Sequence, residues 1–167
     1  MMNRDANYEA EMEDYYKHLY GEDWQMVKEY LEKITDTFDF GYMLAEKSKD
    51  RKIGSHYDPD RVPHFVKAKK LAIEMREKIG DRILIPIRPR SIAWQDLSYH
   101  TIWCEQIADI MIEKCQNHTK EAVRLLEEME DEFGKYDSIL SDRFDFILAM
   151  TAYDPMVRKH TLGVEVV

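Results

Sequence analysis

Glycine, proline and cysteine are all scarce in this chain. Six Gly and five Pro among 167 residues argue against a β-sandwich or barrel, which needs many turns. No two glycines lie within eight residues of each other, so the sequence lacks the glycine-rich loop that binds phosphate through backbone amides. The two cysteines, Cys104 and Cys115, would lie about 16 Å apart along one helix and could not form a disulfide. We therefore expect a reducing, cytoplasmic compartment.

Basic residues are outnumbered, and long apolar runs are missing. The chain has 24 Lys and Arg against 33 Asp and Glu, a formal net charge of −9, which disfavours nucleic acid as a partner. Every apolar run is shorter than the ~20 residues of a membrane-spanning helix. Hydrophobic residues still make up 44% of the chain, enough for a folded core. We predict a soluble single domain over residues 1–167, with two sub-halves, 1–80 and 91–152, as a further division.

Apolar residues recur at steps of three and four along most of the sequence, the pattern of amphipathic helices. Local signals bound these helices: Gly21 follows the first, Asp58-Pro59 starts another, and Ser91 can cap the longest. Asp154-Pro155 is expected to end the last. The pattern predicts about six helices, over residues 8–20, 24–38, 59–79, 92–116, 119–133 and 138–151.

Residues 83–90 (ILIPIRPR) are the one apolar run without a helical period. Two prolines rule out a central strand, so we expect an extended connector packed on the core. A short strand pair could form only near residues 83–87 or 162–167, and residues 41–57 are predicted to be an exposed loop. The predicted fold class is all-α: an irregular bundle of about six helices with one proline-bounded extended connector.

His100 and Cys104 are the one arrangement typical of a catalytic pair, because a spacing of four places them on one helical face. Buried helical cysteine usually acts as a small hydrophobe and nothing supplies an oxyanion hole, so we favour a structural role. No histidine has a glutamate three residues before it, as di-iron bundles require, so we expect no metal site and no cofactor. Two further pairs share a helical face and are interpreted as solvated ion pairs: Asp14 with His18, and His118 with Glu121.

The acidic cluster at residues 127–132 is interpreted as a solvated face, with contact to a basic partner surface as the alternative. Aromatic residues are more informative. Trp24 and Trp103 fit the apolar stripes of their helices and are expected in the core.

Trp94 and Tyr99 fit the stripe of the long helix less well, follow the connector, and lie beside His100. We therefore predict Trp94, Tyr99 and His100 as contact or sugar-binding residues, with at least one of them partly exposed. Burial of all three as ordinary core residues is the alternative.

Three blocks of the sequence carry a resemblance to a known family. They are residues 15–24 (YYKHLYGEDW), 56–65 (HYDPDRVPHF) and 94–100 (WQDLSYH). In this order and spacing they resemble the helical region that follows the catalytic barrel in glycoside hydrolases related to family 20 hexosaminidases and α-glucuronidases. The blocks are distributed along the chain, and the resemblance as a whole extends over most of residues 10–135.

The resemblance implies a non-catalytic accessory domain of a bacterial glycosidase-like protein, C-terminal to a TIM barrel. In that family the catalytic carboxylates belong to the barrel strands, so no catalytic residue is carried over and we do not expect this chain alone to be an enzyme. Its implied partners are the missing barrel, a second copy of the chain, or carbohydrate in a cleft that it helps to shape. The alternative is a stand-alone helical binding or regulatory protein.

Overall fold

The computed structural model describes residues 7–38, 40–43, 58–140 and 142–158, which are helical along most of their length. Six helices of 13 residues or more dominate this part of the chain, which confirms the predicted all-α bundle. Within the described ranges there is no β-strand, and residues 162–167 lie outside them. The elements are, in order, α1 Tyr8–Tyr20, η1 Gly21–Asp23, α2 Trp24–Thr37, α3 Phe40–Met43, η2 Pro59–Arg61, α4 Val62–Ile79, η3 Gly80–Leu84, α5 Arg88–Cys115, α6 Thr119–Gly134, α7 Asp137–Leu140 and α8 Phe146–Arg158, where η marks a 3-10 turn.

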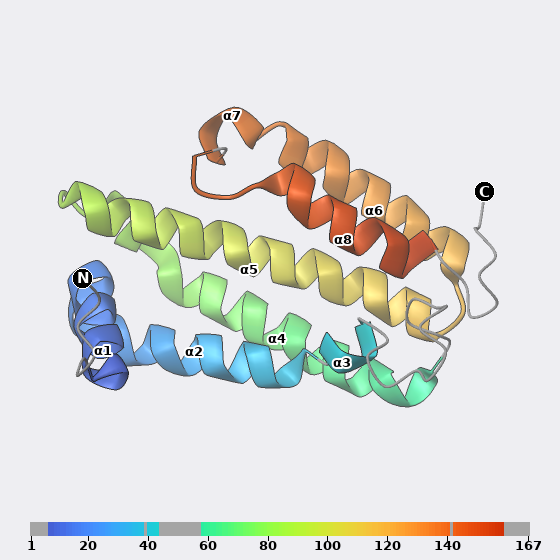
Figure 1. Cartoon of the computed structure of the whole chain (residues 1–167), viewed down its shortest axis with the longest axis horizontal. Helices are drawn as coiled ribbons and strands as arrows, with labels where there is room; N and C mark the ends of the chain where they lie inside the picture. The colour runs from blue at the N-terminus through green and yellow to red at the C-terminus, as the bar shows by residue number, and fades with distance from the viewer. Residues whose placement is uncertain (1–6, 39, 44–57, 141, 159–167) are drawn as a thin grey trace.

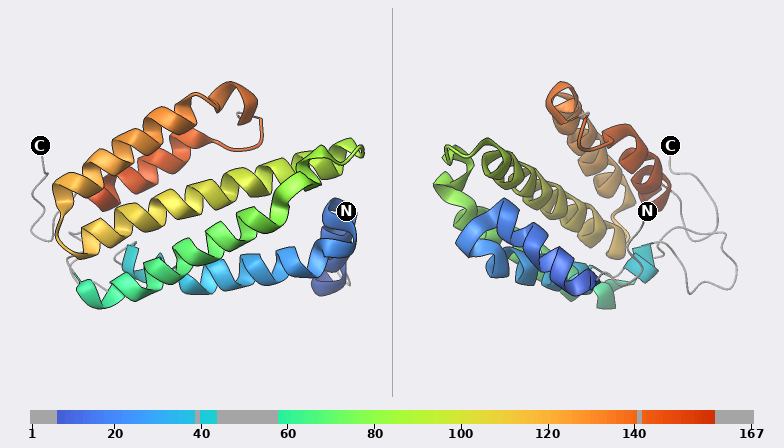
Figure 2. Two further views of the ribbon diagram at one scale, coloured as in Figure 1. Left: turned by 180° about the vertical axis from the view of Figure 1, so that it is seen from behind. Right: turned by 60° about the vertical axis from the view of Figure 1, so that its left-hand side comes forward.

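The 28-residue helix α5 runs through the middle of the bundle (Figure 1). Helices α2 and α4 lie on one side of it, and α6 and α8 lie on the other. Helix α1 packs against α2 and α5 at one end of the molecule (Figure 2). Helix α5 therefore contacts both layers, and residues around most of its circumference are buried rather than those of a single stripe.

Local signals set several of the helix ends as predicted. Gly21 ends α1 with a φ of 62°, a conformation that only glycine adopts without cost. The Asp58 carboxylate accepts a hydrogen bond from the Asp60 amide at 3.2 Å, and Pro59 opens the turn that leads into α4. Gly80 ends α4 with a φ of 44°. Asn7, which no sequence argument singled out, caps α1 through its side-chain oxygen.

The extended connector is shorter than the sequence predicted. Residues 80–84 form a 3-10 turn and α5 already begins at Arg88, so only residues 85–87 are non-helical. Pro89 lies in the first turn of α5, where a missing amide proton costs nothing, and it therefore starts the helix instead of delaying it. Ser91 does not cap α5; it lies inside the helix, and its hydroxyl donates to the Ile83 carbonyl at 2.6 Å.

The last predicted helix, 138–151, was placed wrongly. Residues 137–140 form the short helix α7, and α8 starts at Phe146, where the Asp145 carboxylate accepts from the Leu148 amide at 2.9 Å. Asp154-Pro155 does not end α8, which continues to Arg158. Tertiary contacts hold this last turn, because Val157 is buried and its carbonyl accepts a hydrogen bond from the Lys114 ammonium at 2.6 Å.

Candidate functional site

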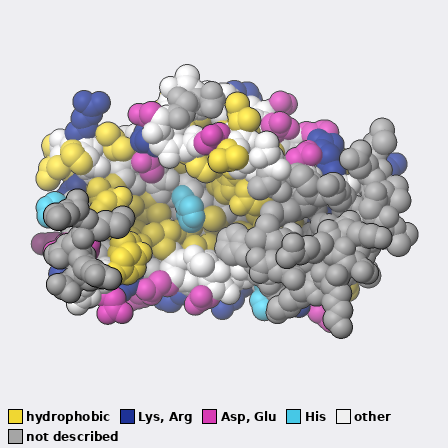
Figure 3. Space-filling view, in the orientation of Figure 1, with side chains coloured by type: hydrophobic (Ala, Val, Ile, Leu, Met, Phe, Trp, Pro, Cys, Tyr) yellow, Lys and Arg dark blue, Asp and Glu magenta, His cyan; other side chains and the backbone are white. Residues whose placement is uncertain are grey.

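An apolar pocket of about 190 Å³ opens on α5, where α6 and the segment between α7 and α8 meet it. Figure 3 shows one face of the molecule, on which hydrophobic side chains surround a histidine near the middle. We call the pocket on α5 the aromatic pocket. Its apolar walls are Tyr99, Trp103, Phe133, Leu140 and Phe144, and its polar residues are Asp96, His100 and Arg143.

Ring contacts hold the walls of the aromatic pocket in place. The Trp103 ring packs edge-on against Phe133 and Phe144, with centroids 4.8 and 5.1 Å apart. Tyr99 is half-buried, and its ring lies 5.4 Å from that of Tyr136. Phe144 is 36% exposed, so the pocket opens to solvent beside it. Such edge-to-face packing fixes the walls and preforms the hollow.

An ion pair forms the polar rim of the aromatic pocket. The Arg143 guanidinium donates to the Asp96 carboxylate at 2.7 Å, to Asp142 at 3.4 Å, and to the Ile139 carbonyl at 2.8 Å. Burial raises the pKa of Asp96, Arg143 opposes this, and the charge of Asp142 adds to the increase. One guanidinium thus serves two carboxylates, so these three side chains together have one more carboxylate than cation.

His100 connects the aromatic pocket to the other layer of the bundle. Its Nδ1 lies 3.3 Å from the Tyr30 hydroxyl of α2, and its Nε2 lies 3.5 Å from the Cys104 sulfur. Burial lowers the pKa of His100 and so favours the neutral ring, whose one unprotonated nitrogen can accept a hydrogen bond from Tyr30 or from Cys104. His100 therefore forms a neutral hydrogen-bonded link between α2 and α5.

The same environment makes Cys104 a poor nucleophile. Burial raises the pKa of its thiol to about 12, whereas nucleophilic cysteines have depressed pKa values and react as thiolates. The spacing of His100 and Cys104 does bring the two side chains together, as the sequence predicted. Their geometry supports the structural interpretation of this pair over the catalytic one.

The three predicted contact residues have different environments. Tyr99 and His100 line the aromatic pocket and are partly accessible, as expected. Trp94 is 0% exposed, so it offers no contact surface within this chain, and the expected partial exposure is found at Tyr99 and His100 instead. The Trp94 ring lies 5.0 Å from that of Tyr20 and 5.5 Å from the Arg82 guanidinium. The periodicity of α5 predicted one apolar stripe, but this helix buries side chains against both layers. Trp94 is therefore covered on a face that was expected to be open.

The other two tryptophans also differ from a simple core assignment. Trp103 is buried, as predicted, yet its side chain also lines the aromatic pocket. Trp24, expected in the core, is only half-buried, and the Lys17 ammonium lies 5.2 Å from its ring centroid. Phe133, Arg143 and the other pocket residues from α6 to α8 were not predicted as site residues, because they reach α5 only through the tertiary fold.

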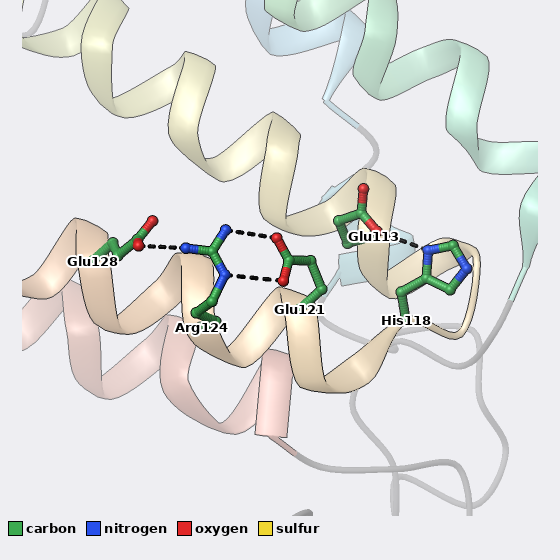
Figure 4. A network of polar contacts seen from close by, with 5 residues as sticks. All are labelled: Glu113, His118, Glu121, Arg124 and Glu128. Carbon is green, nitrogen blue, oxygen red and sulfur yellow. Dashed lines mark hydrogen bonds and ion pairs between the residues drawn. The ribbon is translucent and has the colours of Figure 1, made fainter.

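The remaining polar candidates form ordinary surface contacts. His118 pairs with Glu113 at 2.7 Å and not with Glu121, which instead binds Arg124 through two hydrogen bonds (Figure 4). Arg124 also contacts Glu128, so part of the acidic cluster is neutralised within α6 itself. The described ranges contain no group of three or more His, Cys, Asp or Glu side chains that could hold a metal ion.

His18 likewise does not form the predicted ion pair, since its Nδ1 lies 3.1 Å from the Asp14 backbone carbonyl. None of the described helices has both the length and the apolar composition needed to cross a bilayer.

Comparisons of the chain with family models, with curated proteins and with solved structures give no match in any of the three. The resemblance to the helical region of glycoside hydrolases therefore stays a prediction.

Proposed function

We propose that this chain is a non-catalytic helical interaction domain that docks on a protein partner through the aromatic pocket. The observation that carries the proposal is a preformed apolar hollow that is followed, within four residues of its wall residue Phe144, by exposed apolar side chains. Phe144 is 36% exposed, and Ile147 and Leu148, at the start of α8, are 69% and 66% exposed. Interface hot spots have this arrangement: an aromatic pocket surrounded by apolar surface that excludes water on binding.

The resemblance to the helical region of glycoside hydrolases indicates the partner. It implies the catalytic barrel of a bacterial glycoside hydrolase, against which the domain would pack to steady the barrel or to shape one wall of its carbohydrate cleft. A second copy is the competing occupant, but each copy has a net charge of −9, which opposes self-association. A stand-alone binding or regulatory protein is the alternative function, and a coding sequence upstream of Met1 that continues in frame into a barrel would decide against it.

Two features support the non-catalytic part of the proposal. Glycoside hydrolysis uses two carboxyl groups on opposite sides of the scissile bond, whereas among the described residues Asp96 is the single carboxylate that lines the aromatic pocket, and it is bound to Arg143. The buried Cys104 thiol is protonated at neutral pH. The pocket therefore offers packing surface and little chemistry.

Copurification with the barrel encoded in the same frame or in the adjacent gene tests the proposal. Ile147→Asp should abolish copurification, because it places a charge in the apolar surface beside the pocket. Val66→Asp is the matched control: Val66 is 50% exposed on α4, outside the pocket, and this variant should bind like the wild type. Equal binding by both variants would contradict docking at this surface, and a dimer of the chain alone would point to a second copy.

A further inference from the structure

We propose that the aromatic pocket receives a single aromatic side chain of the partner protein, next to a lysine or arginine of that partner. This inference rests on the proposed docking function and specifies the chemistry of the docking segment. It is carried by three features of the pocket: its volume, the nature of its walls, and the charge of its rim.

The volume fits one ring. A cavity of about 150 Å³ lined by apolar side chains is large enough to bind benzene, and the aromatic pocket measures about 190 Å³. A phenyl or phenol ring therefore fits with little space to spare. The pocket is too small to enclose several side chains, so one anchor residue must occupy it.

The walls favour an aromatic anchor over an aliphatic one. Four of the five apolar wall residues are aromatic, and Trp103 already makes edge-to-face contacts with Phe133 and Phe144. An inserted ring would extend this packing, since aromatic pairs gain more than the apolar area they bury. An aliphatic side chain would fill the space without that gain.

The rim favours positive charge beside the anchor. Asp96 and Asp142 share the guanidinium of Arg143, which leaves the rim with more negative than positive charge. The side chain of Asp142 is 81% exposed and can reach a cation on the partner. The raised pKa of Asp96, due to burial and to Asp142, agrees with a carboxylate that a further cation would stabilise. A lysine or arginine next to the anchor would meet these two carboxylates.

Three short peptides separate the contribution of an aromatic ring to binding from the contribution of the flanking charges. We would titrate the full chain with acetyl-Lys-Phe-Lys-amide, acetyl-Glu-Phe-Glu-amide and acetyl-Lys-Ala-Lys-amide, and follow the backbone amide resonances of Tyr99 and Phe144 by NMR. The Lys-Phe-Lys peptide should shift both resonances and bind about tenfold more tightly than Glu-Phe-Glu, as expected when exposed charge pairs change from attractive to repulsive. The Lys-Ala-Lys peptide should leave both resonances in place.

A matched pair of variants assigns the charge effect to the rim. Asp142→Asn should reduce the preference for Lys-Phe-Lys over Glu-Phe-Glu several-fold. Asp36→Asn removes one exposed carboxylate from α2 and should leave the preference unchanged. Both positions are exposed, so neither substitution should disturb folding.

Several outcomes would overturn the inference. Equal shifts with Lys-Phe-Lys and Lys-Ala-Lys would show that no ring enters the pocket, and equal affinities for Lys-Phe-Lys and Glu-Phe-Glu would remove the role of charge. Tighter binding of free phenethylamine than of the peptide would identify a small amine as the occupant. Any of these results could occur while Ile147→Asp still abolishes copurification, so failure of this inference is distinguishable from failure of the proposed function.

Discussion

The buried lysine of α5 allows a quantitative test of the fold. Lys114 is 3% exposed, and its ammonium donates to the Val157 carbonyl in the last turn of α8. Burial lowers its pKa from 10.5 to about 8, with the neighbouring Cys115 acting in the opposite direction. A pKa difference of about 2.5 corresponds to about 3 kcal/mol of differential stability.

The direction in which pH changes the free energy of unfolding follows from proton binding. Between about pH 8 and the ordinary lysine pKa, the unfolded chain binds the proton of Lys114 and the folded chain does not, so the free energy of unfolding rises with pH. The penalty for the buried charge is thus full below the folded pKa and disappears above the unfolded pKa. Tyr42 and Cys115 act in the opposite direction, because burial raises their pKa values and folding is disfavoured once their unfolded forms ionise.

Comparison with Lys114→Met isolates the contribution of Lys114 to the pH dependence of stability, because methionine keeps much of the side-chain volume and loses the charge. At neutral pH the two proteins should have similar stability, since removing the desolvation cost is offset by leaving the Val157 carbonyl without this donor. Between about pH 7.5 and about pH 10, the wild type should gain about 2 kcal/mol relative to the variant. Urea unfolding of both proteins at the two pH values measures this difference. Identical pH dependences would refute the assigned burial of Lys114.

Further predictions concern the thiols, the pocket wall and catalysis. Cys104 and Cys115 are both buried, with pKa values raised to about 12 and about 11. A disulfide reagent at about pH 8 should therefore label these thiols only after denaturation. Fast labelling of the native chain would contradict their burial. Trp103→Ala should cost about 3 kcal/mol in urea unfolding, the low end for a large aromatic residue, because the side chain already borders the pocket. A cost near zero would show that the ring is not packed as described. The purified chain should hydrolyse aryl glycosides no faster than background, and turnover that persists on repurification and is lost when Asp96 is replaced would disprove the non-catalytic assignment.

The sequence predicted those parts of the fold that depend on neighbouring residues. Gly21 and Asp58-Pro59 bound their helices because glycine at positive φ and proline in a first turn act within a few residues. The start of α8 could not be found this way. Phe146 packs on Trp103, with ring centroids 6.0 Å apart, and this contact between residues far apart in sequence favours starting the helix there.

The candidate site was predictable in part for a similar reason. Tyr99 and His100 were identified because they depart from the apolar stripe of their own helix. Trp94 departs from it equally, but α1 and Arg82 cover it. Periodicity describes one helix against one neighbour, and it cannot show which faces a second layer covers. Phe133 and Phe144 complete the pocket from other elements, which no local pattern could reveal.

Hydrogen–deuterium exchange of the chain alone and in complex with the proposed barrel partner tests most directly where that partner docks. The aromatic pocket should become protected on complex formation, with slower exchange over residues 96–103 of α5 and 142–148 before and within α8, because docking suppresses local opening there. Helix α4, on the opposite side of α5, should exchange at the same rate in both states. Protection of α4 with unchanged exchange around Tyr99 would contradict the account.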